Sequence, residues 1–340
     1  MRQAHRSSVV PRTEPKPLNL QPFSVDCYTN CAMSYAHRGI RTLCLLLSTL
    51  ILALSPALWA QEPAPQTPAV DLVREAVAQE VSAGSNPSAK FMFRSRKQTP
   101  KGSQTRLYIE TNEALAGMLI AVNDQPLSAQ QQQQEQDHLD WLINNPDQLR
   151  KKEARERDDN ERTMKILKAL PDAFRYEYIG LEQGDAEMGK PGDTMVRLKF
   201  TPNPEYSPPT HVEQVLQGMQ GYLVIDKSEH RLARIDGTLF RDVTFGWGII
   251  GHLDKGGHFL VQQADVGEGY WEISAMSLKM TGKILFFKSI SMMSDEKFTD
   301  FQRVADSLSF AKGVELLKSE QEKLAHNHLP EPSESKKSPQ

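Results

Sequence analysis

Two histidines, His252 and His258, come nearest in this sequence to the type and spacing of a metal site. They flank residues 254–257, whose composition predicts a tight turn, and a hairpin at that turn would make the two rings face each other. Asp254 or Asp265 would then supply a third ligand. Two histidines without a fixed third ligand are nevertheless a weak basis for a metal site. We therefore predict no bound metal and interpret both histidines as surface residues of a hairpin.

Three glycines, Gly246, Gly248 and Gly251, have the spacing of a dinucleotide-binding loop. Such a loop works between a strand and a helix, because the helix N-terminus binds the pyrophosphate. Here a turn at 252–257 and a further strand from Phe259 follow instead. The sequence therefore predicts no nucleotide site, and the glycines indicate a tight turn or a close approach of two backbones in a sheet.

The common catalytic motifs are missing from the sequence. It contains no nucleophile elbow, no phosphate loop and no helix with paired histidines. Acids such as Asp236, Asp242 and Asp265 form no pair that can be placed at catalytic separation. We therefore predict a protein that is not an enzyme and that uses no cofactor. A hydrolase with a site that the sequence does not reveal stays open as an alternative.

Apolar residues recur at alternate positions of several expected strands. Alternation collects them on one face of a sheet, and a curved sheet would present that face as an apolar hollow. We predict that an apolar ligand binds there. The candidate ligand-binding residues are Leu198, Phe200, Val224, Ile235, Leu239, Phe259 and Trp271. The alternative is that they form an ordinary filled core.

The elements that would position these residues begin with a helix over 70–81, which has apolar positions at helical spacing. Short strands are predicted by period-two alternation and by turn residues between them. They are expected at 90–97, 105–111, 117–122, 174–178, 196–200, 222–225, 232–240, 243–245, 259–266, 271–280 and 283–287. Breaks at this spacing indicate antiparallel hairpins. The predicted fold class is α+β, mainly β, with a curved antiparallel sheet (a half-barrel), an N-terminal helix and a long inserted charged helix.

The inserted segment, 128–170, differs in composition from the strands around it. Asn145 and Pro146 predict a helix start, with proline at the first helical position. Residues 150–162 mix acids and bases, which favours a solvated helix face over a partner-binding surface.

The bulk charge argues against a protein that binds nucleic acid. The full chain has 340 residues and a formal net charge of -3. Six basic and two acidic residues precede Gln61, so the remainder carries 34 basic and 41 acidic side chains. A binder of the phosphate backbone needs a basic stripe, which this mildly acidic chain does not have.

An export signal is predicted inside the N-terminal part of the chain. A basic patch at 37–41 precedes an apolar stretch at 42–54, and small residues lead to a cleavage site near Ala60. Because Met33 would give a signal of ordinary length, we interpret 33–60 as the signal peptide and 1–32 as a probable gene-model extension. All three cysteines, Cys27, Cys31 and Cys44, precede the site, so the mature chain would have no thiol. An uncleaved N-terminal anchor is the alternative.

The predicted domain organisation follows from these boundaries. Residues 61–69 form a flexible lead-in that is rich in Gln, Pro and Ala. Residues 70–312 form the β domain, with the helical insertion at 128–170. Residues 313–340 form a tail that is helical at first and then polar and disordered.

One block of residues resembles a known family. Residues 200–204 (Phe-Thr-Pro-Asn-Pro), 221–226 (Gly-Tyr-Leu-Val-Ile-Asp) and 231–237 (Arg-Leu-Ala-Arg-Ile-Asp-Gly) follow one another at short intervals. This block is similar to the sheet of bacterial outer-membrane lipoprotein-sorting carriers (LolA/LolB-like). The resemblance implies an N-terminal helix followed by a curved antiparallel sheet that wraps around helices and holds an acyl chain. The charged helix is longer than in the simple carrier, and no ligand-contact residue is carried over.

These observations predict a non-enzymatic protein of the bacterial envelope, periplasmic or secreted. It would bind lipid, lipoprotein or another apolar ligand in a half-barrel, and neither nucleic acid nor nucleotide. The alternative is an envelope scaffold that acts through its charged helix. Neither the ligand nor the oligomeric state follows from the sequence.

Overall fold

The computed structural model describes residues 67–85, 89–245, 251–284 and 288–327. All of them belong to one compact unit, 61–340. The predicted extension, the signal peptide, most of the lead-in, the end of the tail and the loop at 246–250 lie outside the described residues. Among the helices of the described ranges, none combines the length and the apolar composition needed to span a bilayer.

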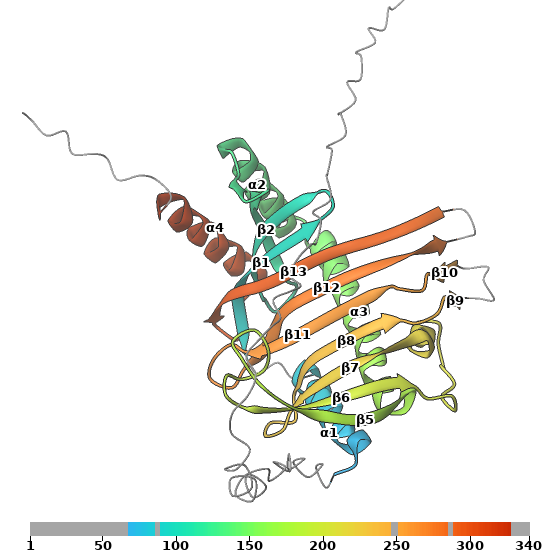
Figure 1. Cartoon of the computed structure of the whole chain (residues 1–340). Coiled ribbons are helices and arrows are strands. Elements are labelled where there is room, and N and C mark those ends of the chain that lie inside the picture. Colours follow the sequence, from blue (N-terminus) through green and yellow to red (C-terminus); the bar gives the residue numbers. More distant parts are fainter. Residues whose placement is uncertain (1–66, 86–88, 246–250, 285–287, 328–340) are drawn as a thin grey trace, which may run out of the picture. The chain divides into compact units, whose positions relative to one another are not determined.

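The described chain is dominated by one antiparallel sheet, drawn in Figure 1. Its strands are β1 (Lys90–Thr99), β2 (Gly102–Ile109), β3 (Ala116–Val122), β4 (Gln125–Pro126), β5 (Phe174–Gln183), β6 (Thr194–Pro202), β7 (Met219–Asp226), β8 (Leu232–Leu239), β9 (Val243–Phe245), β10 (Gly251–Leu253), β11 (His258–Asp265), β12 (Trp271–Ile284) and β13 (Lys288–Val304). The main path runs β4-β3-β2-β1-β13-β12-β11-β8-β7-β6-β5, and β9 and β10 pair beside it. The path ends at β4 and at β5, so the sheet is open. This confirms the predicted fold class.

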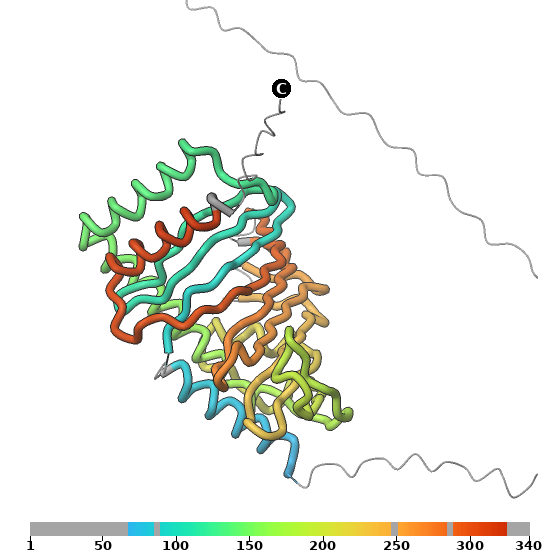
Figure 2. Tube along the Cα trace, turned by 90° about the vertical axis from the view of Figure 1, so that its left-hand side faces the viewer, coloured from blue at the N-terminus to red at the C-terminus, as the bar shows by residue number. Residues whose placement is uncertain are grey.

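Four α-helices and one short 3-10 helix accompany the sheet in the described ranges. They are α1 (Ala69–Ser85), α2 (Ala129–Asn144), α3 (Pro146–Ala173), α4 (Phe310–Asn327) and η1 (Glu213–Gly218). Helix α1 lies at the β5–β8 end of the sheet and α4 at the β1–β3 end, as Figures 1 and 2 both show. The helices therefore divide between the two ends of the sheet.

The larger core lies between α1, α3 and η1 and the face of β5–β8, β11 and β12 that they cover, which we call the inner face. Apolar residues recur in α1 at helical spacing, and Val73, Ala76 and Val77 are buried against this face. Leu170 of α3 and Leu223 of β7 belong to the same cluster.

A second core lies on the opposite face, at the β1–β3 end. Ile109 of β2, Met118 of β3 and Leu317 of α4 are fully buried there, and Leu139 of α2 packs with them. The two cores lie on opposite faces of one sheet, and a strand can contribute to both because its neighbouring side chains point to opposite faces. In β1, Met92 belongs to this second core.

Helix α3 connects the two ends of the molecule. Glu156, in its N-terminal half, accepts a hydrogen bond from the backbone N of Leu115 at 3.0 Å, beside β3. Its C-terminal half packs in the inner-face core through Ile166, Leu167 and Leu170. The long charged helix of the prediction is therefore a strut across the molecule as well as a solvated face.

The charged stretch of α3 pairs its acids and bases within the helix. Lys152 and Glu156 lie 2.6 Å apart, and Asp159 and Arg162 also 2.6 Å. The helix begins at Pro146, as predicted, but the Asn145 side chain makes no capping hydrogen bond and instead donates to the Trp141 carbonyl. By contrast, α2 has a complete capping box, which Ser128 forms with Gln131.

Two predictions about strand boundaries are wrong. A break was expected at 281–282, but β12 continues through Gly282 to Ile284. Gly282 is needed there because β10 passes close: a Cβ atom would lie 2.1 Å from the carbonyl oxygen of His252. The following strand, β13, was not predicted, because all of its 17 residues are partly or fully exposed and show no apolar stripe.

The expected hairpin around residues 254–257 is also absent from the described part of the sheet. Both β10 and β11 pair with β12, β10 with residues 282–284 and β11 with residues 271–279. They therefore follow one another along the same edge of β12, and residues 254–257 bulge out between them. A local turn signal does not distinguish such an excursion from a hairpin.

Candidate functional site

A cavity of about 810 Å³ lies between the inner face and the helices that cover it, and we call it the sheet cavity. Strands β6, β7, β8, β11 and β12 form one wall, and α1, α3 and η1 form the other. Phe91 of β1 and Tyr270 complete the lining and contact each other edge to face, with ring centroids 5.7 Å apart. Binding pockets for small molecules typically have volumes of about 300–1,000 Å³ and a mainly apolar lining with few polar groups. The sheet cavity has both features.

Four of the seven predicted ligand-binding residues line the sheet cavity. They come from four different strands and are Phe200, Ile235, Phe259 and Trp271. Phe200 and Trp271 are buried, whereas Ile235 and Phe259 are half-buried. Strand alternation thus predicted a shared surface, and the pairing of distant strands brings the four side chains together.

The other three predicted residues lie elsewhere. Leu198 and Leu239 are buried in the inner-face core and take no part in the cavity lining. Val224 is on the opposite face of β7, in a small cluster with Met188, Met195 and Trp271. Val224 does not point to the inner face, because it lies between Leu223 and Ile225 of the inner-face core and side chains alternate along a strand. It nevertheless packs with one of the other predicted residues, Trp271.

Some apolar side chains of the lining are exposed to solvent, and we call this part of the sheet cavity its mouth. Val212, Ile273 and Met276 line it, and their exposed fractions are 38%, 37% and 40%. Large apolar side chains are usually more buried than this, and an exposed apolar rim is typical of a binding surface. Ligand would therefore have a route from solvent to the buried lining.

One wall of the sheet cavity is charged. Glu80 of α1 is 8% exposed and accepts two hydrogen bonds from the Arg231 guanidinium, at 2.7 and 3.1 Å. It also accepts from the backbone N of Leu232 at 3.0 Å and from Nε2 of Gln263 at 3.3 Å. A buried ion pair is tolerated when its remaining hydrogen-bonding capacity is satisfied in this way. Glu80 and Arg231 therefore neutralise each other.

Glu272, which also lines the sheet cavity, is in a different situation. Within the described residues its carboxylate accepts no hydrogen bond. Burial is the main cause that raises the pKa of Glu272 to about 7, with the charges of Glu110 and Glu80 adding to it and that of Arg231 opposing them. Glu272 lies near the start of β12, before the stretch from Ala275 to Ile284 that pairs with β13. Near neutral pH the cavity therefore contains a carboxyl group close to half protonation.

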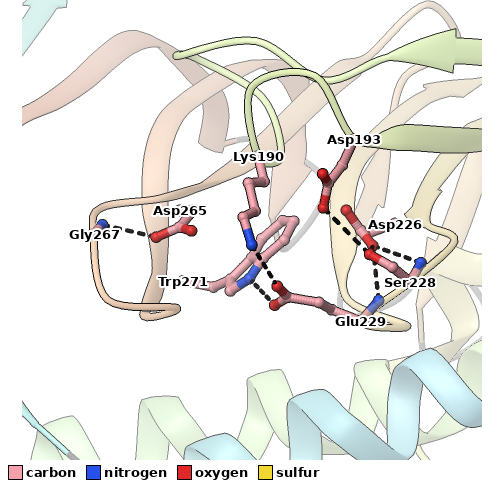
Figure 3. Close-up of polar contacts among 8 residues, drawn as sticks. All are labelled: Lys190, Asp193, Asp226, Ser228, Glu229, Asp265, Gly267 and Trp271. Atoms are coloured by element: carbon pink, nitrogen blue, oxygen red, sulfur yellow. Dashed lines mark hydrogen bonds and ion pairs between the residues drawn. The ribbon is translucent and has the colours of Figure 1, made fainter.

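Trp271, which lines the sheet cavity, is fixed in place by a hydrogen bond drawn in Figure 3. Its Nε1 donates to Glu229 at 2.8 Å, and Lys190 donates to the same carboxylate at 3.3 Å. The Arg231 guanidinium lies over the indole ring, 5.5 Å from its centroid. A rigid aromatic wall costs little conformational entropy when a ligand packs against it.

Figure 3 also shows the turn between β7 and β8, which carries Asp226, Ser228 and Glu229. Asp226 is fully buried and accepts hydrogen bonds from the backbone N of Ser228 and of Glu229, both at 2.8 Å. The Ser228 hydroxyl lies 2.7 Å from Asp226 and 3.2 Å from Asp193, and its single hydrogen can serve one of them. This network shapes the turn that carries Glu229, and so positions the partner of Trp271.

The candidate metal ligands are not brought together. His252 contacts Asp254 at 3.2 Å, and His258 contacts Asp236 at 2.9 Å. Asp265 accepts from the backbone N of Gly267, as Figure 3 shows. In the described ranges, no three His, Cys, Asp or Glu side chains are grouped so that they could hold a metal ion.

Sequence reasoning missed the charged wall, although one signal was available. Glu80 lies four residues after Ala76 and seven after Val73, so it falls on the apolar stripe of α1. An acid on such a stripe predicts a buried partner. For Glu272 the signal was obscured, because an irregularity between Gln262 and Gln263 shifts the register of β11 against β12.

Comparisons of this chain with models of protein families, with curated proteins and with solved structures gave no match.

Proposed function

We propose that this protein is an exported, non-enzymatic protein of the bacterial envelope that binds a ligand with a hydrocarbon chain, such as a lipid or the acyl part of a lipoprotein, in the sheet cavity. The observation that carries the proposal is the cavity of about 810 Å³ with its mainly apolar lining. The similarity of residues 200–237 to lipoprotein-sorting carriers supports the same ligand class, and the export signal predicted at 33–60 supports the location.

The exposed mouth of the cavity favours a chain-like ligand, which can extend from the buried lining to the mouth, over a compact ligand that the cavity would enclose completely. Ile273 and Met276 remain substantially exposed, whereas Phe200 and Leu223 deeper in the lining are almost completely buried. A chain that entered past the first two side chains would remove their apolar surface from water, which contributes about 25 cal/mol per Å² buried.

The test is binding of the neutral apolar dye N-phenyl-1-naphthylamine, followed by its fluorescence, together with native mass spectrometry of the purified protein. We expect saturable dye binding and displacement of the dye by a long-chain alcohol. Met276→Glu should weaken binding at least about tenfold, because a carboxylate at the mouth must lose hydration when an apolar ligand covers it.

A matched control is available in Met293. Its exposed fraction, 38%, is close to the 40% of Met276, but Met293 does not line the sheet cavity. Met293→Glu should therefore leave dye binding unchanged. A wild-type protein that binds no dye, or two variants that are equally impaired, would contradict the proposal.

A further inference from the structure

The negative and positive charges of the ionisable side chains at the sheet cavity do not cancel. Glu80 and Arg231 form a closed pair, but Glu272 lies beside them without a hydrogen-bond partner in the described chain. Glu110, which follows β2 and whose charge acts on Glu272, is another acid, and it accepts from the backbone N of Phe91 at 2.9 Å. Lys90 acts on Glu110 and donates to the Asn112 side chain. The charges that act on Glu272 itself are thus two acids, Glu80 and Glu110, and one base, Arg231, which is already bonded to Glu80.

The other cation of the lining does not restore the balance. Arg162 of α3 lines the sheet cavity, but it is mostly exposed and pairs with Asp159 at 2.6 Å. Gln263 of β11 lines the cavity too, and its side chain is uncharged and bonded to Glu80. An anionic group at this end would therefore be repelled, and a cationic group would find an unused carboxylate.

We propose that the ligand of the sheet cavity is an amphiphile with a protonated amine as its head group, which donates hydrogen bonds to Glu272 while its chain packs along Phe200, Ile235 and Phe259. The inference rests on the proposed function and names its ligand class. A carboxylate that lines an apolar pocket is costly when unpaired, and an N–H donor that carries positive charge removes that cost. Tyr270 and Trp271, the two residues before Glu272 in the sequence, also line the cavity, and their aromatic rings suit a cation.

The test compares dodecylamine, dodecanol and dodecanoate, which share one chain length and differ in the head group. Each displaces N-phenyl-1-naphthylamine from the full chain at concentrations below those at which the amphiphiles aggregate. At pH 8 we expect dodecylamine to bind at least about tenfold more tightly than dodecanol, the size expected for a hydrogen bond to a charged group. Dodecanoate should bind more weakly than dodecanol.

Glu272→Gln supplies the decisive variant. It should keep the affinity for dodecanol, which also shows that it folds, and lose the preference for the amine. The preference of the wild type should decrease from pH 8 to pH 6, because protonated Glu272 must first release its proton. Glu187→Gln, an exposed glutamate outside the cavity lining, should behave as the wild type does.

The outcomes separate the two proposals. Equal affinities for the three amphiphiles at pH 8, or tightest binding of dodecanoate, would overturn the head-group assignment and leave the apolar ligand site standing. An amine preference that survives in Glu272→Gln would overturn it as well. Failure of all three to displace the dye would reject the ligand site itself, and the head group with it.

Discussion

At the scale of single residues, two glutamates of the cavity lining have opposite roles because of their partners. Glu80 has four hydrogen bonds, two of them from Arg231, and forms part of the framework. Glu272 has none among the described residues, and burial raises its pKa to about 7. A carboxyl group whose environment disfavours its charge is a candidate for function, since a framework role would have selected a paired or an apolar side chain.

Glu272 should make the stability of the protein depend on pH. Its pKa is about 7 in the folded protein and about 4.3 in an unfolded chain, so between these values the folded state binds more protons. Stability therefore decreases as pH rises from 5 to 8, by roughly 1–3 kcal/mol for this group. Urea unfolding should show that Glu272→Gln is more stable than the wild type at pH 8 by about that amount, and similar to it at pH 5.

The control for this prediction is Glu177→Gln. The Glu177 side chain is 71% exposed and lies 4.0 Å from Lys199, so its removal should change stability by less than about 0.5 kcal/mol at either pH. If the stability of the wild type and of Glu272→Gln depended on pH in the same way, the pKa of Glu272 would not be shifted in the folded protein.

At the scale of elements, the edge of β12 decides how two short segments join the sheet. Strands β10 and β11 pair in succession with β12, and residues 254–257 bulge out between them. The backbone N of Asp254 donates to the Thr281 carbonyl at 2.9 Å, which anchors the start of the bulge to β12. The arrangement needs a residue without a side chain at 282, where the two backbones are closest.

Gly282→Ala should therefore destabilise the protein by roughly 1–3 kcal/mol, as overpacking of a close contact does. The added Cβ atom would lie 2.1 Å from the His252 carbonyl oxygen, which is backbone and cannot rotate away. Gly180→Ala is the matched control in β5, because its Cβ would meet nothing within 4 Å. Equal loss of unfolding free energy in both variants would mean that β10 does not approach β12 as described.

At the scale of the whole molecule, one sheet carries two cores on opposite faces. The sheet cavity belongs to the inner-face core, whereas α2 and α4 cover the other face at the β1–β3 end. Helix α3 and the continuous strands join the two regions. Both cores should therefore contribute to the free energy of unfolding, whereas ligand binding should depend on the inner-face core.

Leu317→Ala tests this division. Leu317 of α4 is fully buried in the second core, and its truncation should cost about 2–5 kcal/mol in urea unfolding. Binding of N-phenyl-1-naphthylamine by the folded variant should remain within about twofold of the wild type, because distant sites act independently. Loss of dye binding in a variant that still unfolds cooperatively would show that the two faces are coupled.

Much of the architecture follows from local pattern. Alternation and turn residues predicted most strands, helical spacing predicted the helix at 70–81, and Pro146 marked the start of the charged helix. These signals are read correctly because they depend on neighbours in the chain. The 17-residue β13 was missed because it has little apolar alternation that a local pattern could reveal. Its position in the sheet depends on pairing with β1 and β12.

By itself, the sequence determined a mainly antiparallel fold, the order of its elements and four aromatic or aliphatic residues of the cavity lining. Only the tertiary structure decided which face each side chain joins, because an irregular register in β11 and β12 changes the parity of alternation. The tertiary structure also forms the charged wall, because it brings together Glu80 and Arg231, which are 151 positions apart in the chain. Contacts over such separations depend on how strands pair in space, which no local spacing of residues encodes.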